Sequence, residues 1–334
     1  MMMKNIENIW SDLEREHSGR DAFLYKRYSA NINPDVFLAL KGHEKHRCIA
    51  ARISSGAGLN LKKWVNQFKD IKIERFPDEY TGKTFLLIVL LNENHKDIFS
   101  TLCGDLIHQV AHVVDEKKLI EVLINRLEKW RKLFEKIRQG GLTDAAQQGL
   151  YGELFFLRKF LRRSTSPESC IESWKGPERE LQDFQYSDWA VEVKTTCSKN
   201  HQKIHISSER QLDTSLVSNI FLVHYSLETR QKFGETINDI VDELRNSLSE
   251  SPASLSLFDF KLAESGYFDI HRHLYGEKGF SIREEKIYKI GEGFPRITES
   301  QVPSGVGDVR YSIIVADSGK WQVGEEEMFD FLKF

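Results

Sequence analysis

Residues 182–195, QDFQYSDWAVEVKT, decide the fold of this chain. They begin with a short polar segment, pass through four polar, turn-forming residues at 185–188, and return as a largely apolar run from 189 to 195. A turn between two β-prone segments is typical of a β-hairpin. We therefore predict a hairpin here and examine which side chains it brings together.

One face of the predicted hairpin carries three charged side chains. Successive strand residues point to opposite faces, so Glu192 and Lys194 share a face with Ala190. A turn of four residues puts Asp183 opposite a position near Ala190, on that same face. Cross-strand neighbours lie about 4.5–5.5 Å apart, so both carboxylates can reach one hard cation such as Mg²⁺. Two carboxylates beside a lysine fit metal-assisted hydrolysis of a phosphodiester.

The pattern Glu-x-Lys alone is weak evidence. It occurs three times, at 116–118, 192–194 and 284–286. What separates Glu192 and Lys194 is their place within an apolar strand, where charges are costly unless they are paired or bind a ligand. An amphipathic strand with a surface ion pair stays an alternative at this point.

The segments around the hairpin predict a small α/β core. A helix is expected from Thr143, a natural N-cap, to about residue 163. We expect strands at 170–174 and 220–225 and a short helix after Ser208. The order is helix, three strands, helix, strand, with the acidic hairpin in the middle.

Several sequence blocks resemble one known family. They are Gly149–Leu154 (GLYGEL), Ser173–Pro177 (SWKGP), Asp183-Phe184, Val191–Thr195 (VEVKT) and Ile206–Leu212 (ISSERQL). In this order they look like the PD-(D/E)XK family of bacterial proteins of unknown function, which often accompanies restriction or phage-defence genes. The resemblance implies a restriction-endonuclease-like α/β (α+β) fold.

The resemblance also implies roles for individual residues. Asp183 and Glu192 would be metal ligands together with the backbone carbonyl of Val193, and Lys194 would be the catalytic lysine. Glu153, on the first helix, would approach the metal through water. Gln211, on the following helix, would lie within reach of the site or of the DNA backbone.

The chain departs from the family pattern at one position. Gln182 stands where the motif has proline before the aspartate. Variation at this position is common in the superfamily, so the expected chemistry stands.

The rest of the chain predicts a second folding unit. Residues 1–114 read as a mixed α/β domain for recognition or partner contacts, and residues 142–334 as the nuclease domain with a β-rich C-terminal extension. Between them, 115–141 reads as a connecting amphipathic helix that ends at Gly140-Gly141. Its apolar residues recur at steps of three and four, which fits packing within its own domain or a dimer contact. Within the N-terminal domain we expect strands at 36–40, 48–53 and 85–91 and a helix at 96–113.

Composition narrows the class of protein. The 334 residues are 40% hydrophobic and 29% charged, as in an ordinary globular protein. The longest apolar run, 85–91, is far below the roughly 20 residues that span a bilayer. No apolar stretch follows Lys4, so we expect no signal peptide and a cytoplasmic location. The four cysteines stand alone without a CxxC pair, which argues against a zinc ribbon.

Charge does not by itself indicate a nucleic-acid partner, since the net charge is −3. Local basic stripes lie between 116 and 139 and at 158–163, and each fits either phosphate binding or a solvated helix face.

Together these observations predict a Mg²⁺-dependent DNA endonuclease, with Mn²⁺ able to substitute, in a restriction-modification or phage-defence system. Expected partners are DNA, a second copy of the chain, and a methyltransferase or helicase of the same system, without a membrane. Two alternatives stay open: a non-catalytic recognition or structural subunit, and an RNA or structure-specific repair nuclease.

Overall fold

The computed structural model describes residues 6–16, 23–56, 69–137, 140–197, 203–215, 217–315 and 318–334. The chain forms two compact units, Met1–Gly141 with Ser251–Ile270, and Leu142–Glu250 with His271–Phe334. The units divide the chain after residue 141, where the sequence also suggested a boundary, but they group 251–270 with the N-terminal part. The functional division into domains stays a prediction.

The first unit is built on a five-stranded antiparallel sheet with the order β1-β2-β3-β5-β4. The strands are β1 (Phe23–Arg27), β2 (Val36–Lys41), β3 (His46–Ile53), β4 (Ile71–Asp78) and β5 (Lys83–Leu90). The helices are α1 (Ile6–Glu16), α2 (Lys96–Val110), α3 (Glu116–Ile137) and α7 (Pro252–Ser265), with a short 3-10 turn η2 (Glu93–His95). The predicted strands 36–40, 48–53 and 85–91 are confirmed as β2, β3 and β5.

The apolar residues of α3 are part of this unit's own core. Leu123, Leu127 and Trp130 are almost completely buried together with residues of the sheet, α1 and α2. Phe260 of α7 belongs to the same cluster, which ties α7 to this unit. The apolar face of α3 is therefore used inside the chain, and the homodimer stays a prediction without that face as its interface.

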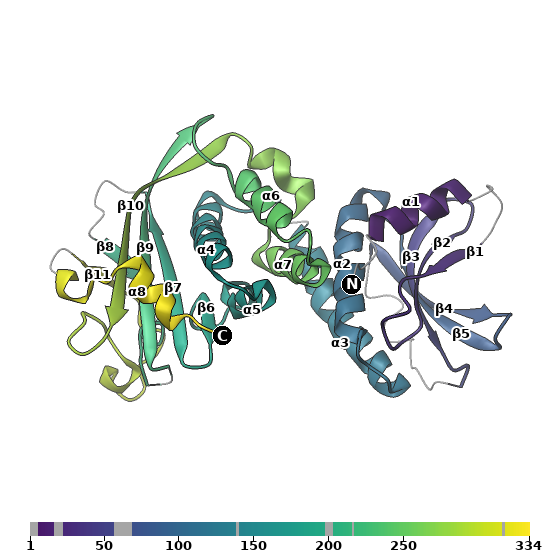
Figure 1. Ribbon diagram of the computed structural model, residues 1–334, viewed down its shortest axis with the longest axis horizontal. Coiled ribbons are helices and arrows are strands. Elements are labelled where there is room, and N and C mark those ends of the chain that lie inside the picture. The colour runs from purple at the N-terminus through teal and green to yellow at the C-terminus, as the bar shows by residue number, and fades with distance from the viewer. Residues whose placement is uncertain are drawn as a thin grey trace. The chain divides into compact units, whose positions relative to one another are not determined.

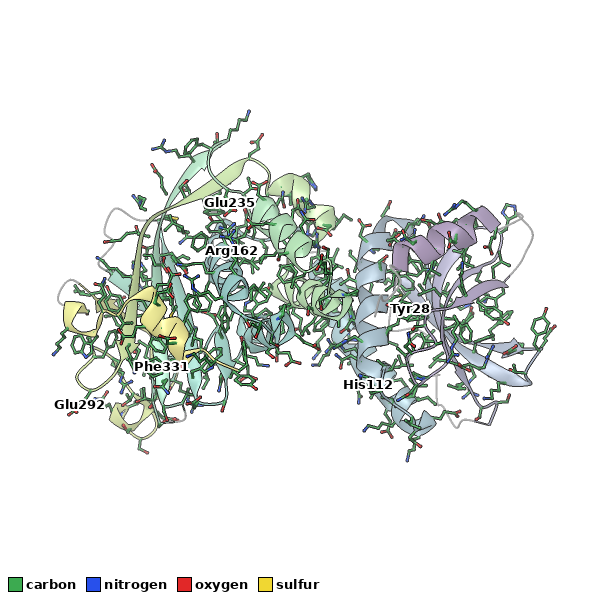
Figure 2. All side chains as sticks on the ribbon, in the orientation of Figure 1. Tyr28, His112, Arg162, Glu235, Glu292 and Phe331 are labelled. Carbon is green, nitrogen blue, oxygen red and sulfur yellow. The ribbon has the colours of Figure 1, made fainter. Side chains whose placement is uncertain are left out.

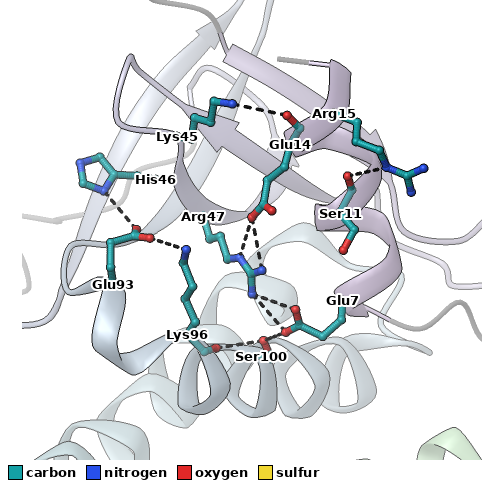
Figure 3. A network of polar contacts seen from close by, with 10 residues as sticks. All are labelled: Glu7, Ser11, Glu14, Arg15, Lys45, His46, Arg47, Glu93, Lys96 and Ser100. Carbon is teal, nitrogen blue, oxygen red and sulfur yellow. Dashed lines mark hydrogen bonds and ion pairs between the residues drawn. The ribbon is translucent and has the colours of Figure 1, made fainter. Parts of the chain in front are cut away.

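A charged residue of β3 fixes α1 to the sheet. Arg47 is 7% exposed and lies between two carboxylates of α1, with its Nη1 3.0 Å from Glu7 Oε2 and its Nη2 3.3 Å from Glu14 Oε1 (Figure 3). Its guanidinium also stacks on Trp10 at 4.8 Å from the ring centre. Ser100 of α2 donates a hydrogen bond to Glu7, which extends this polar network to the next helix. The network orients α1 and α2 on the sheet.

The second unit contains a four-stranded mixed sheet, in the order β10-β9-β7-β6, and a two-stranded sheet, β11-β8. The strands are β6 (Phe184–Tyr186), β7 (Trp189–Thr196), β8 (Lys203–Ile206), β9 (Asn219–Gln231), β10 (Lys278–Ile290) and β11 (Tyr311–Ile314). The helices are α4 (Asp144–Arg163), α5 (Pro167–Ser173), α6 (Ile237–Ser247) and α8 (Glu325–Phe331), with 3-10 turns η3 (Gly176–Glu178), η5 (Glu299–Gln301) and η6 (Ser318–Trp321). The 3-10 turn η4 (Asp269–Leu274) crosses the boundary between the units after Ile270. Strand β7 pairs in parallel with β9 and antiparallel with β6, which places it inside the sheet.

Helix α4 packs on one face of this sheet, and the small β8-β11 sheet packs on the other (Figure 1). Gly152 of α4 lies against Val193 and Thr195 of β7. On the opposite face, Ala190 of β7 shares a core cluster with Ile204 of β8. The carboxylate-bearing strand is thus held between two layers.

The basic residues at 158–163 are paired inside the unit. Arg158 pairs with Glu235 and Glu243, and Arg162 lies 2.6 Å from Glu243 of α6. Figure 2 labels Arg162 and Glu235, which both belong to the second unit. Lys159 and Arg163 pair with carboxylates of β10 and α8. These cations join α4 to its neighbours, a structural role that neither the phosphate-binding nor the solvated-face interpretation of this stripe included.

Two predicted elements of the core were wrong in type. Residues 170–174 fall in α5 and its C-cap, not in a strand, because Pro167 at the first helical position presets the helical φ angle; only Trp174 pairs with Phe184. After Ser208 the chain makes turns closed by i→i+3 hydrogen bonds, Gln211 N to Ser208 O and Asp213 N to Arg210 O, and no α-helix forms there. The α/β fold class is confirmed.

No helix in the described ranges combines the length and apolar content that a membrane crossing requires.

Candidate active site

The hairpin has a shorter turn than we predicted. Tyr186 pairs with Trp189 and Phe184 with Val191, so the turn is Ser187-Asp188, with Ser187 in the left-handed region at φ 46°. Continuing this register puts Asp183 opposite Glu192 instead of Ala190. The error is two residues, and side chains alternate with a period of two, so Asp183 keeps the predicted face.

Asp183 is held by main-chain groups on both sides. Its Oδ2 accepts a hydrogen bond from Val193 N at 2.8 Å. Its own carbonyl oxygen accepts from Lys175 N at 2.6 Å and Gly176 N at 2.9 Å. The N–H and C=O of one strand residue point to the same side, so the Val193 carbonyl also lies on the side of Asp183, where β6 has ended.

Glu192 has one saturated and one free carboxylate oxygen. The side chain is 1% exposed. Its Oε1 accepts from Lys194 Nζ at 2.6 Å and from Gln211 Nε2 at 2.8 Å. Its Oε2 is buried and has no hydrogen-bond partner among the residues that the structure describes. A buried carboxylate oxygen without a partner is costly, and a cation at this oxygen would remove that cost.

Glu153 reaches the same place from α4. Its Oε2 accepts a hydrogen bond from Trp174 Nε1 at 2.7 Å. The backbone of Gly176 lies so close that an added Cβ would collide with Glu153 Oε2 and stand 3.2 Å from Asp183 Oδ1. Both carboxylates therefore border one small space, which only the absence of a side chain at 176 leaves open.

Burial and mutual repulsion shift the acidities of this cluster. Burial, with the charge of Asp183 added, raises the pKa of Glu192 to about 8. The same two causes raise the pKa of Glu153 well above its ordinary value, and burial raises the pKa of Asp183. Burial opposes the charge of Lys194, but Glu192 and Asp183 outweigh it and raise the pKa of this lysine. Clustered carboxylic acids with raised pKa values are frequent at functional sites.

The structure thus brings all five predicted site residues together. Asp183, Glu192, Lys194, Glu153 and Gln211 belong to the second unit and are linked directly or through a neighbour. Gln211 reaches Glu192 from a turn, where we expected a helix.

The donor set fits a hard divalent cation. Within the described ranges, no three His, Cys, Asp or Glu side chains come close enough to hold an ion between them. The fit therefore depends on Asp183, the free Oε2 of Glu192 and the Val193 carbonyl, with water for the remaining positions. Mg²⁺ usually keeps several waters and needs only one or two carboxylates.

The other two Glu-x-Lys pairs have ordinary surroundings. Glu116 accepts hydrogen bonds from the N–H and hydroxyl of Ser54, as part of the packing of α3. Glu284 and Lys286 form a partly exposed pair at 3.0 Å on β10. Burial is what distinguishes the pair on β7 from these two.

Sequence reasoning assigned no role to Trp174, Gly176 or Gln182. Trp174 and Gly176 belong to one of the blocks that carry the family resemblance. This was the one feature of the sequence that could have indicated a role for them. Their contacts with Glu153 depend on how the segment between α4 and β6 folds back, which no local pattern shows.

A glutamate on a helix beside a hairpin with an aspartate and Glu-x-Lys is the arrangement that the resemblance to PD-(D/E)XK proteins led us to expect. A family model described as "Putative PD-(D/E)XK family member, (DUF4420)" matches residues 6–316, and the chain belongs to this family. No protein with curated information and no solved structure shows a significant match to it.

Proposed function

We propose that this protein is a metal-dependent DNA endonuclease that hydrolyses phosphodiester bonds. Family membership supports a nuclease. The observation that carries the proposal is the buried carboxylate of Glu192, whose Oε1 accepts from two donors while Oε2 has no partner in the described part of the chain. Such a group is poorly suited to a purely structural role and well suited to binding a cation.

The proposed roles follow from these contacts. Asp183, Glu192 and the Val193 carbonyl would hold the ion, and Glu153 would act on it through water. A bound Mg²⁺ would polarise the scissile phosphate and supply an activated water. Lys194, whose Nζ lies 2.6 Å from Glu192 Oε1, would hold a water oxygen and offset the charge of the phosphate. The all-oxygen donor set favours Mg²⁺, with Mn²⁺ as a substitute.

The biological setting belongs to the same proposal. The sequence blocks shared with defence-associated proteins support a role in restriction-modification or phage defence in the cytoplasm, beside a methyltransferase or helicase. In this setting, the first unit would contact the target or a partner, since all five proposed site residues lie in the second.

The test compares two Glu-x-Lys pairs within the second unit. Purified protein with Mg²⁺ is expected to nick or cut DNA, and Glu192→Gln or Lys194→Met should lower the rate by at least about a hundredfold, comparable to the loss of one preorganised group that stabilises charge in a transition state. The matched changes Glu284→Gln and Lys286→Met should leave the rate unchanged.

Parallel assays with duplex, single-stranded and branched DNA and with RNA identify the substrate. A preference for RNA or branched DNA would replace the duplex assignment and keep the hydrolytic one. Cleavage that survives both changes on β7, or wild-type protein that neither cuts nor binds Mn²⁺ in calorimetry, would contradict the proposal.

A further inference from the structure

We infer that Gln182 is a positioning residue, which holds the turn at 208–211 so that Gln211 can donate its hydrogen bond to Glu192. The inference deepens the proposed function, because it identifies what orients a proposed metal ligand. Gln182 stands where the family motif has proline, a residue that lacks a side-chain donor.

The first step is the contact between Gln182 and the turn. Gln182 is 3% exposed, and its Nε2 donates to Gln211 O at 3.1 Å and to Arg210 O at 3.4 Å. Two carbonyl oxygens can accept only from the NH₂ end of an amide, so the orientation of this side chain is fixed by its partners. Gln182, the residue directly before Asp183, is therefore hydrogen-bonded to the turn that carries Gln211.

The second step is the side chain of Gln211, which is held at both ends. Its Oε1 accepts from Ser207 N at 2.8 Å, and its Nε2 donates to Glu192 Oε1 at 2.8 Å. A movement of the turn would break one of these bonds or both. The backbone position that Gln182 holds thus determines whether Gln211 reaches Glu192.

The third step is the effect on Glu192. With Gln211 and Lys194 both on Oε1, the carboxylate is oriented so that Oε2 is the free oxygen. Without Gln211, only Lys194 would hold the group, and the carboxylate could rotate. Partners that orient a metal ligand in this way typically contribute about ten- to hundredfold to metal affinity or activity.

Other contacts hold the far end of the same segment. Leu212 is completely buried in the core cluster that includes Ala190 and Ile220, and Arg296 Nη1 donates to Leu212 O at 2.6 Å. The rival view is that these contacts suffice to place Gln211. The two views predict different behaviour for a chain without the amide of Gln182.

The experiment compares Gln182→Leu with Gln147→Leu. Gln147 is an equally suitable buried glutamine of the same unit, 6% exposed, whose Nε2 donates to Leu142 O at 3.0 Å. Both changes remove one buried amide of the same size and should lower the thermal midpoint similarly. Only Gln182→Leu should weaken Mn²⁺ binding in calorimetry and slow Mg²⁺-dependent cleavage, by about tenfold.

A double-mutant cycle tests whether Gln182 acts through Gln211. Gln182→Leu should add little to the loss already caused by Gln211→Leu, because both disrupt one chain of contacts. Full additivity, or equal metal affinity in Gln182→Leu and Gln147→Leu, would overturn the inference.

Hydrogen exchange separates this inference from the proposed function. In Gln182→Leu, the backbone amides of residues 207–213 should exchange faster than in wild type and in Gln147→Leu, with or without metal. If these amides are unaffected, the inference is wrong whatever the protein does. If these amides exchange faster but wild-type protein shows no metal binding and no cleavage, the proposed function is wrong. The conclusion that Gln182 holds the turn is then still correct.

Discussion

Gly176 is the point where the carboxylates of Glu153 and Asp183 come together. Any side chain there would meet Glu153 Oε2 first. Its φ angle is outside the left-handed region, so alanine is compatible with the backbone and the effect of the change is steric. Gly176→Ala should displace Glu153 from Trp174 while the fold is kept.

The expected result is a loss of metal-dependent cleavage of about tenfold or more, with a loss in the free energy of unfolding of about 1–3 kcal/mol, as is typical of overpacking. Cleavage assays beside urea unfolding measure the two quantities. Gly276→Ala, where an added Cβ meets nothing within 4 Å, is the control. A variant that keeps full activity would show that the position of Glu153 is not needed.

At the residue scale, the sequence predicted which side chains come together. It predicted less well the strand register and the contacts that hold them there. Alternation along a strand placed Asp183, Glu192 and Lys194 on one face, and that conclusion survived a register error of two residues. The contacts of Trp174 with Glu153 and of Gln182 with the turn could not be predicted, because each joins segments at least 20 residues apart through irregular backbone.

Helix α4 contains two glycines with opposite surroundings. An added Cβ at Gly149 meets nothing within 4 Å, whereas one at Gly152 would collide with Thr195 Cγ2. Glycine within a helix costs about 0.5–1 kcal/mol relative to alanine. At Gly152 the absence of a side chain lets α4 approach β7. At Gly149 glycine lowers the stability of the helix without allowing any closer packing.

Gly149→Ala should stabilise the protein by about 0.5–1 kcal/mol. Gly152→Ala should destabilise it, since overpacking typically costs about 1–3 kcal/mol and exceeds the helical gain. Urea unfolding followed by circular dichroism gives both values. Equal effects of the two changes would contradict the close packing of α4 on β7.

At the element scale, periodic segments were predictable and short ones were not. The regular spacing of apolar residues gave α3 and α4 with ends close to those observed. Residues 170–174 are apolar enough for a strand, but Pro167 starts a helix that continues through Ser173. Residues 208–211 are too few for a helix to gain its hydrogen bonds, and the turn there is held by contacts with other segments.

For the whole molecule, the sequence could not show that residues 251–270 leave the second unit and pack with the first. Phe260 joins the core of α2 and α3, and this pairing links segments more than 100 residues apart. The five proposed site residues, by contrast, lie within one continuous stretch, 153–211. Ionisation of these residues should therefore affect the stability of the second unit and leave the stability of the first unit unchanged.

The metal-free site gives this stability a dependence on pH. Burial raises the pKa of Glu192 to about 8, from an ordinary value of 4.5 that the unfolded chain regains. Between these two values the folded protein keeps a proton that the unfolded chain has lost, so stability falls as pH rises. Glu153 and Asp183 have raised pKa values and act in the same direction. The raised pKa of Lys194 has no effect here, because this lysine is charged in both states within that range.

We expect the second unit of the metal-free protein to lose stability between about pH 5 and pH 8. Each unit of pKa difference corresponds to about 1.4 kcal/mol, so Glu192 alone contributes on the order of a few kcal/mol. Hydrogen exchange followed by mass spectrometry, in the presence of chelator, measures the two units separately. Glu192→Gln should flatten much of this slope and make the metal-free protein more stable than wild type at pH 8.

Mg²⁺ should reverse the loss in wild-type protein at pH 8, since an ion that binds only the folded state stabilises it, by about 2.7 kcal/mol at a hundredfold excess over its Kd. The same addition should leave Glu192→Gln nearly unchanged, while Glu284→Gln on β10 should behave as wild type. Equal stabilisation of Glu192→Gln and wild type would place the ion elsewhere. A slope of the same size in the first unit would show that the pH dependence does not arise from the carboxylates around β7.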